Sequence, residues 1–175
     1  VSYEEWRERF PKIPGAMVPS GPNQLPLLNF GPDVGKGILS KEPPAIMDAA
    51  GYSIGIPVPD ADGNDLGGVA APMVQAPLAT YTGWNLRGRH AGHGATFEFT
   101  GSTIPFPETP EEREATRDPR TSILERYGSK EGYIAAIRTA AEKLVSEGLM
   151  LEEDVERAVA LAADWCRPRH GVRLL

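Results

Sequence analysis

Two neighbouring histidines are the first residues of the sequence that could do chemistry. His90 and His93 stand in the run Arg-Gly-Arg-His-Ala-Gly-His-Gly over residues 87–94. On a helix this spacing would place both imidazoles on one face, but three glycines in so short a run disfavour a helix. A zinc site needs three or four ligands, and no nearby carboxylate or thiol is spaced to complete one. We therefore predict a polar loop; weak metal or anion binding and a place in a pocket lining stay open, and no metal or cofactor is assigned.

The run Asp-Ala-Asp-Gly-Asn-Asp over residues 60–65 has the composition of a calcium loop. An EF-hand loop needs glycine at its sixth position and a bidentate glutamate at its twelfth. Counted from Asp60, those positions hold Asp65 and Ala71. A polar hairpin turn is the favoured interpretation, and an adventitious cation site is the alternative.

Serine chemistry needs a nucleophile, a base and an orienting acid. In α/β hydrolases the serine stands in a Gly-x-Ser-x-Gly turn from a strand into a helix. We identify no such turn: Ser20, Ser53 and Ser102 lie near glycines, but we predict that none of them completes it. No phosphate-binding or dinucleotide-binding glycine motif is found either. We assign no catalytic residue.

Composition narrows the function classes. A net charge of −6 and a pI near 5.1 disfavour nucleic acid as a partner. No apolar run is long enough for a membrane span, and no targeting segment indicates a compartment. The lone Cys166 excludes an internal disulfide. A first residue other than Met leads us to expect a processed product, a trimmed chain or a fragment.

The 19 glycines and 17 prolines lie mostly in the first part of the chain, which predicts a loop-rich region over residues 1–107. A short helix over 2–10 has a capping box and an aromatic face, which we expect to pack on polypeptide outside this chain. The proline-rich stretch 12–50 predicts extended segments and turns. Edge strands are predicted near 52–58, 66–70 and 78–86.

The second part of the chain, 108–175, is predicted to be helical. Thr109 and the following proline and glutamates predict one helix start, and Asp118-Pro119 predicts another for a helix to about residue 127. Apolar residues at helical spacing then predict an antiparallel hairpin of 130–147 and 151–166. The fold class is therefore α+β.

The run Pro-Leu-Ala-Thr-Tyr-Thr-Gly-Trp-Asn-Leu-Arg over residues 77–87 resembles a hallmark of bacterial α/β hydrolase domain-containing proteins, a large and poorly characterised family. Other similar segments follow in the same order as in that family: 10–15, 29–32, 43–44, 58–64, 100–106, 118–120, 125–127 and the closing helical pair. The match is to the C-terminal third of such proteins.

This resemblance implies a part of a larger α/β-hydrolase fold, with the nucleophile and the histidine upstream of Val1. The chain would be a non-catalytic part of an ester or related hydrolase that covers the core and shapes its substrate cleft. Its partner would be the upstream core, in the same polypeptide or a separate chain. The candidates for facing that core or cleft are Trp84, Asn85, Arg87 and Ser102, with a purely structural role as the alternative. A binding or assembly module with a Trp/Tyr/Arg docking surface, and a small metalloprotein using the two histidines, are the rival functions.

Overall fold

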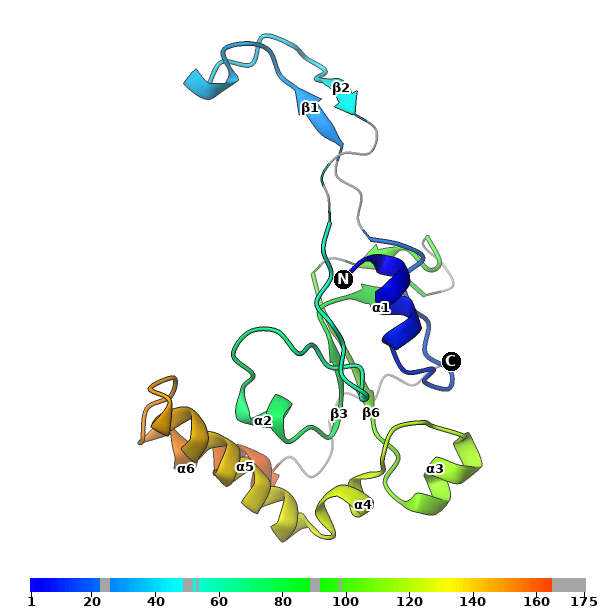
Figure 1. The fold of residues 1–175 in the computed structure, drawn as a ribbon, viewed down its shortest axis with the longest axis vertical. Helices are drawn as coiled ribbons and strands as arrows, with labels where there is room; N and C mark the ends of the chain where they lie inside the picture. The colour runs from blue at the N-terminus through cyan, green and yellow to red at the C-terminus, as the bar shows by residue number, and fades with distance from the viewer. Residues whose placement is uncertain (23–25, 49–51, 53, 89–91, 98, 165–175) are drawn as a thin grey trace.

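The computed structural model describes residues 1–22, 26–48, 52, 54–88, 92–97 and 99–164. In this part of the chain, helices are combined with three two-stranded antiparallel sheets (Figure 1). This is the predicted α+β class. His90, Trp165 and Cys166 lie outside the described residues.

Helix α1 (Tyr3–Arg9) forms where its capping box predicts it. The Ser2 hydroxyl accepts a hydrogen bond from the backbone N–H of Glu5, whose side chain accepts one from the backbone N–H of Ser2. Its aromatic face packs against other residues of this chain, so the expectation that it packs on polypeptide outside the chain was wrong. Trp6 and Phe10 are buried with Ile13, against partly buried residues from later in the chain.

A hairpin arm follows, formed by β1 (Leu27–Asn29) and β2 (Ala45–Asp48) and including the short 3-10 helix η1 (Val34–Lys36). The strands pair antiparallel with one irregularity in register. Figure 1 shows the arm extending away from the rest of the molecule. The proline pattern predicted extended segments here, but it did not predict that two of them pair as strands. Prolines indicate where a helix is disfavoured, and they do not indicate which extended segments pair with each other.

The strands predicted over 52–58 and 66–70 are absent from the described residues of those segments. A single β-bridge between Pro59 and Asp65 closes the loop formed by residues 60–64. Pro57 and Pro59 have no N–H to donate to a ladder, and the Asp60 carboxylate instead accepts hydrogen bonds from the backbone of residues 62 and 64, each 2.8 Å long. The alternating apolar residues therefore line an irregular segment. The short helix α2 (Pro72–Gln75) comes next.

The strand predicted over 78–86 is divided into two. β3 (Ala79–Thr82) pairs with β6 (Ser102–Pro105), and β4 (Asn85–Leu86) pairs with β5 (Thr96–Phe97). The division falls at Gly83-Trp84, between the two strands. Thr82 stabilises it because its hydroxyl donates to the Trp84 carbonyl at 2.6 Å.

The helices of the second part are α3 (Pro110–Thr116), α4 (Ile123–Tyr127), α5 (Lys130–Ser146) and α6 (Asp154–Asp164). Thr109 caps α3 as predicted. Helix α4 begins later than predicted, with Ser122 as its cap, because the Asp118 carboxylate binds Arg120 and does not cap a helix. Helices α5 and α6 form the predicted pair, α6 starting three residues later than expected (Figure 1).

The main core lies where the helical pair meets the start of β3. Its buried members are Ala76, Leu78, Tyr133, Ile137 and Ala162. Small alanines on α5 and α6 permit a close approach of the two helices. This core fixes α4 and α5 beside the central β3–β6 pair.

A buried arginine joins the two parts of the fold. The Arg120 side chain is 1% exposed and makes a double contact with the Asp118 carboxylate, at 2.9 and 2.6 Å. The same guanidinium donates to the Thr80 hydroxyl and to the carbonyls of Ile104 and Pro105, each at 2.9 Å. One side chain thus ties the segment before α4 to both central strands.

Candidate functional site

Trp84, the centre of the recognised sequence run, is partly buried and packs against the aromatic cluster of α1. Its ring lies 6.2 Å from that of Trp6 and 6.0 Å from that of Phe10, measured between centroids. Aromatic pairs at such distances stabilise a core. In the described structure Trp84 therefore holds α1 against the central strands and does not present an open docking face.

Ser102 lies in β6, beside the turn that contains Trp84. Its hydroxyl donates to the Trp84 carbonyl at 2.9 Å, and its backbone N–H donates to the Thr82 hydroxyl at 3.2 Å. The preceding Gly101 leaves no room for a side chain, because a Cβ there would lie 2.1 Å from the Thr82 carbonyl oxygen. These contacts fix the turn and do not expose Ser102 as a nucleophile.

Asn85 lies in β4, and Arg87 directly follows this strand where the turn to β5 begins. The Asn85 amide donates to the Thr100 hydroxyl at 3.3 Å, and the Arg87 guanidinium lies 5.2 Å from the centre of the Phe97 ring. Arg87 is exposed, and Phe99, whose ring lies 5.8 Å from that of Phe97, is 87% exposed. Of the four predicted cleft-facing residues, Arg87 is the one whose side chain the structure leaves open to a partner.

Of the two histidines, the structure describes only His93. His93 lies in the turn between β4 and β5, and His90 falls outside the described residues. Within the described part of the chain, no three His, Cys, Asp or Glu side chains gather closely enough to hold a metal ion.

The acidic run 60–65 forms the expected polar turn. The Asp60 carboxylate closes it by accepting two backbone N–H groups, and the Asn64 amide donates to the Ala79 carbonyl at 3.2 Å. Partial burial, and then the charge of Asp60, raise the pKa of the Asp65 carboxyl. The loop is therefore joined to β3 and serves as structure.

One motif was overlooked in the sequence. Residues 51–55 read Gly-Tyr-Ser-Ile-Gly, which fits the Gly-x-Ser-x-Gly pattern with Ser53 at its centre. Ser53 lies outside the described residues. The pattern gains meaning from a strand before it and a helix directly after it. β2 ends shortly before this motif, but residues 54–58 after it are irregular and contain Pro57, so no helix follows.

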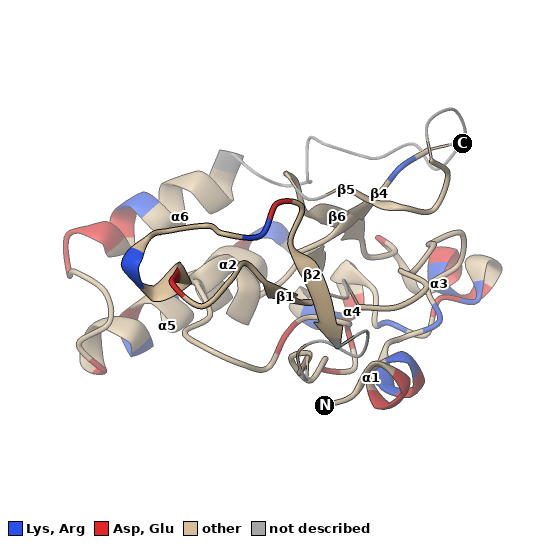
Figure 2. Cartoon of the chain, turned by 90° about the horizontal axis from the view of Figure 1, so that it is seen from above, with Lys and Arg blue, Asp and Glu red and all other residues tan. Residues whose placement is uncertain are grey.

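Several exposed apolar residues lie on the arm. Ile46 and Met47, neighbours in β2, are 65% and 67% exposed. Successive strand residues point to opposite faces, so neither face of this ribbon is covered. Three more exposed apolar residues lie between the strands: Val34, Ile38 and Leu39. Figure 2 shows acidic and basic residues on the helices α1, α3, α5 and α6, and also on the loop that joins β1 to β2.

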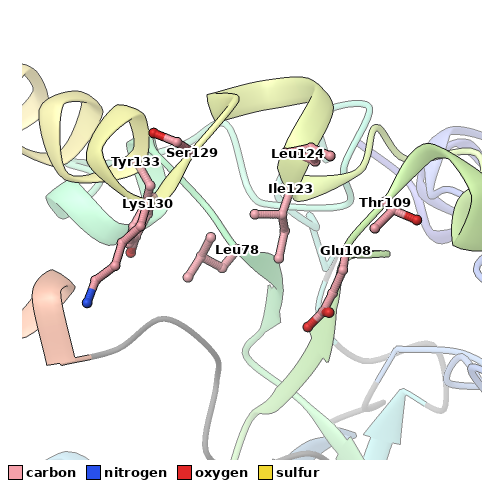
Figure 3. Close-up of a pocket in the computed structure, with 8 residues that line it drawn as sticks. All are labelled: Leu78, Glu108, Thr109, Ile123, Leu124, Ser129, Lys130 and Tyr133. Carbon is pink, nitrogen blue, oxygen red and sulfur yellow. The ribbon is translucent and has the colours of Figure 1, made fainter.

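A separate hollow lies between α4 and the first turn of α5 (Figure 3). We call it the α4–α5 pocket; its volume is about 250 Å³. Its lining residues are Leu78, Glu108, Thr109, Ile123, Leu124, Ser129, Lys130 and Tyr133. Burial raises the pKa of the Tyr133 phenol to about 12, so the hydroxyl of this lining residue is uncharged at neutral pH.

Taken together, the described residues form an α+β assembly of small antiparallel sheets, in which no nucleophile, base and acid are brought together. The sequence model of the α/β hydrolase domain matches residues 34–160, well over half of the chain. The chain therefore belongs to the α/β hydrolase domain family. Comparison with curated proteins and with solved structures gave no match. No helix in the described part of the chain is long and apolar enough to cross a membrane.

Proposed function

We propose that this chain is a non-catalytic part of an α/β-hydrolase-type enzyme that cleaves ester or related bonds. It packs against the catalytic core, present in the same polypeptide or in a separate chain, and shapes the substrate cleft. The family assignment supports the hydrolase class, and the exposed apolar arm is the observation that carries the packing role.

The arm supports this proposal because it has no packing partner within the described chain. None of its residues belongs to either buried apolar cluster. A two-stranded hairpin is marginally stable in water unless it packs on something. The family match begins at Val34, so most of the arm is part of the hydrolase-domain sequence. A catalytic core of the same family is thus the natural partner of the arm.

The contacts of Ser102 and the backbone of residues 54–58 support the non-catalytic role. The Ser102 hydroxyl already donates within its own turn, and residues 54–58 do not form the helix that follows the nucleophile in α/β hydrolases. An esterase also needs a base within hydrogen-bond reach of the nucleophile. We therefore expect the chain alone to be inactive toward p-nitrophenyl acetate and unreactive toward a fluorophosphonate probe.

The same assay run on the protein that unites this chain with its catalytic core should show hydrolysis. Phosphonylation of Ser53 in the isolated chain, abolished by Ser53→Ala, would show that the chain carries its own nucleophile and would overturn the proposal.

The packing role has its own test in the arm. The double substitution Ile46→Asp, Met47→Asp should leave the melting temperature of the isolated chain unchanged, because both side chains are already in water. In the united protein it should destabilise the assembly by about 1.5–3 kcal/mol per side chain, the value for burying such residues. Leu161→Asp on α6, where the leucine is also exposed, is the matched control. Equal effects of the arm and control variants would contradict an interface at the arm.

The structure gives little support to the rival function, a binding module with a Trp/Tyr/Arg docking surface. Trp84 is packed on α1, and Tyr81 is largely inside, where burial raises the pKa of its phenol. Arg87 is the remaining exposed member of that set.

A further inference from the structure

The α4–α5 pocket has a shape and a lining suited to a small ligand, and nothing in the hydrolase proposal uses it. Its floor is Leu78, at the start of β3, and the buried Tyr133 of α5. Ile123 and Leu124 of α4 form one wall. Figure 3 shows these side chains around one hollow, with Leu78 near its middle. The surface that a ligand would meet is therefore mainly hydrocarbon.

Its volume sets the size of the ligand. An apolar cavity of about 150 Å³ accepts a benzene molecule. The 250 Å³ of this pocket accommodate such a ring, or a chain of five or six carbons, with a short polar extension. Larger drug-sized molecules occupy pockets of roughly 300 Å³ or more, so a small amphiphile fits best.

The charged side chains at the rim of the pocket determine which polar group a ligand would carry. Lys130 and Glu108 lie on opposite sides of Leu78 in Figure 3, and both extend past the apolar floor. The described residues place no carboxylate within 4 Å of the Lys130 ammonium. On the other side, the Glu108 segment is bound to its neighbours: its backbone N–H donates to Glu112 at 2.7 Å and its carbonyl accepts from Leu124 at 3.0 Å.

We propose that the α4–α5 pocket binds a small carboxylate with an apolar body, such as a short fatty acid. The hydrocarbon chain lies over Leu78 and Tyr133, and the carboxylate pairs with the Lys130 ammonium on the side away from Glu108.

Hexanoate is the probe, added to the complete chain and followed by calorimetry and by NMR shifts of residues on α4 and α5. Burial of its five-carbon chain would give a dissociation constant of about 1 mM. Pentanol and pentylamine, with the same five-carbon chain, are compared under the same conditions. We expect hexanoate to bind about fivefold tighter than pentanol, the effect of one exposed ion pair, and pentylamine to bind more weakly than either.

Two variants separate the charge from the cavity. Lys130→Gln should weaken hexanoate binding about fivefold and leave pentanol binding unchanged, while Lys143→Gln, on the same helix but outside the pocket, should change neither. Leu124→Trp should fill the hollow and weaken both ligands, since Leu124 is half exposed and tolerates a larger side chain. Melting temperatures establish that each variant is folded.

Equal affinity for hexanoate and pentanol, or an unchanged hexanoate affinity in Lys130→Gln, would overturn the assignment of a carboxylate. Unchanged binding in Leu124→Trp, or no binding of any probe, would overturn the pocket as a ligand site. None of these results depends on whether the chain joins a catalytic core.

Discussion

Replacing Arg120 with methionine is the most direct test of what holds this fold together. Methionine keeps much of the length and fills apolar space, but it removes every hydrogen bond of the guanidinium. The Asp118 carboxylate would stay buried without its cation, since its own side chain is 7% exposed. The carbonyls of Ile104 and Pro105 would each lose a donor at 2.9 Å.

The size of the effect follows from these contacts. Breaking a buried ion pair by removing one partner costs about 3–5 kcal/mol, and each orphaned buried carbonyl adds on the order of 1 kcal/mol. Because these losses overlap, we expect a total of about 4–5 kcal/mol. A protein of this size is stabilised by about 5–15 kcal/mol in all. The melting temperature should therefore fall by about 10 °C or more.

Thermal and urea unfolding followed by circular dichroism measure the change. The control is Arg138→Met, which removes an equally short ion pair, 2.6 Å to Glu156, on the exposed side of the helical hairpin. That variant should melt close to the wild type, since exposed pairs contribute little. Adding Asp118→Asn to Arg120→Met should recover part of the loss, because the uncompensated buried charge is then gone. A single Arg120→Met variant that melts within about 2 °C of wild type would refute the reasoning.

Two further predictions concern backbone strain and pH. Gly63→Ala should destabilise the chain by about 2–3 kcal/mol, because Gly63 has φ +85° and a Cβ there would lie 2.9 Å from the Phe10 ring. The control is Gly68→Ala, at a glycine with φ +77° in open space, which should destabilise the chain by only about 1 kcal/mol. Urea titrations that give both variants the same loss of stability would contradict the packing argument. Burial raises the folded-state pKa of Tyr133 to about 12, above its usual value of 10, so its contribution to stability is complete below pH 10 and is lost as the pH rises towards 12. Stability measured across that window should fall less in Tyr133→Phe than in wild type, whereas Tyr52→Phe, at an exposed tyrosine, should behave like wild type.

The local signals in the sequence were reliable where one segment carried all the information. The capping box at Ser2 and the cap at Thr109 are both present in the structure. The apolar spacing of α5 placed Tyr133, Ile137 and Leu144 on its buried face. Caps and helical faces depend on residues within a few positions of each other, so a sequence pattern can specify them.

Prediction failed where distant segments decide the outcome. The alternation in 52–58 is typical of a strand, yet Ile56 exchanges hydrogen bonds with Val1 and no ladder extends beyond it. The aromatic face of α1 was expected to need outside polypeptide, and Trp84 covers it from within the chain. In both cases the partner lies more than fifty residues away, and no local pattern identifies it.

The candidate site shows the same division. The run around Trp84 indicated the hydrolase family from the sequence, and the family match agrees with it. The roles of its residues did not follow, because a tryptophan and an arginine at this spacing serve a core as readily as a cleft. The α4–α5 pocket could not be foreseen at all, since its lining comes from four separate segments of the chain.

The amino-acid order by itself determined the α+β class, the capped helices, the helical hairpin and the family, because each depends on propensity, short-range spacing or a continuous motif. Only the tertiary structure decided that Arg120 is the buried junction, that Trp84 faces inward, that the β1–β2 arm stays uncovered, and that a hollow opens beside Leu78. These features arise from contacts between segments far apart in the chain, where packing and the pairing of buried polar groups select the partner and local preference does not.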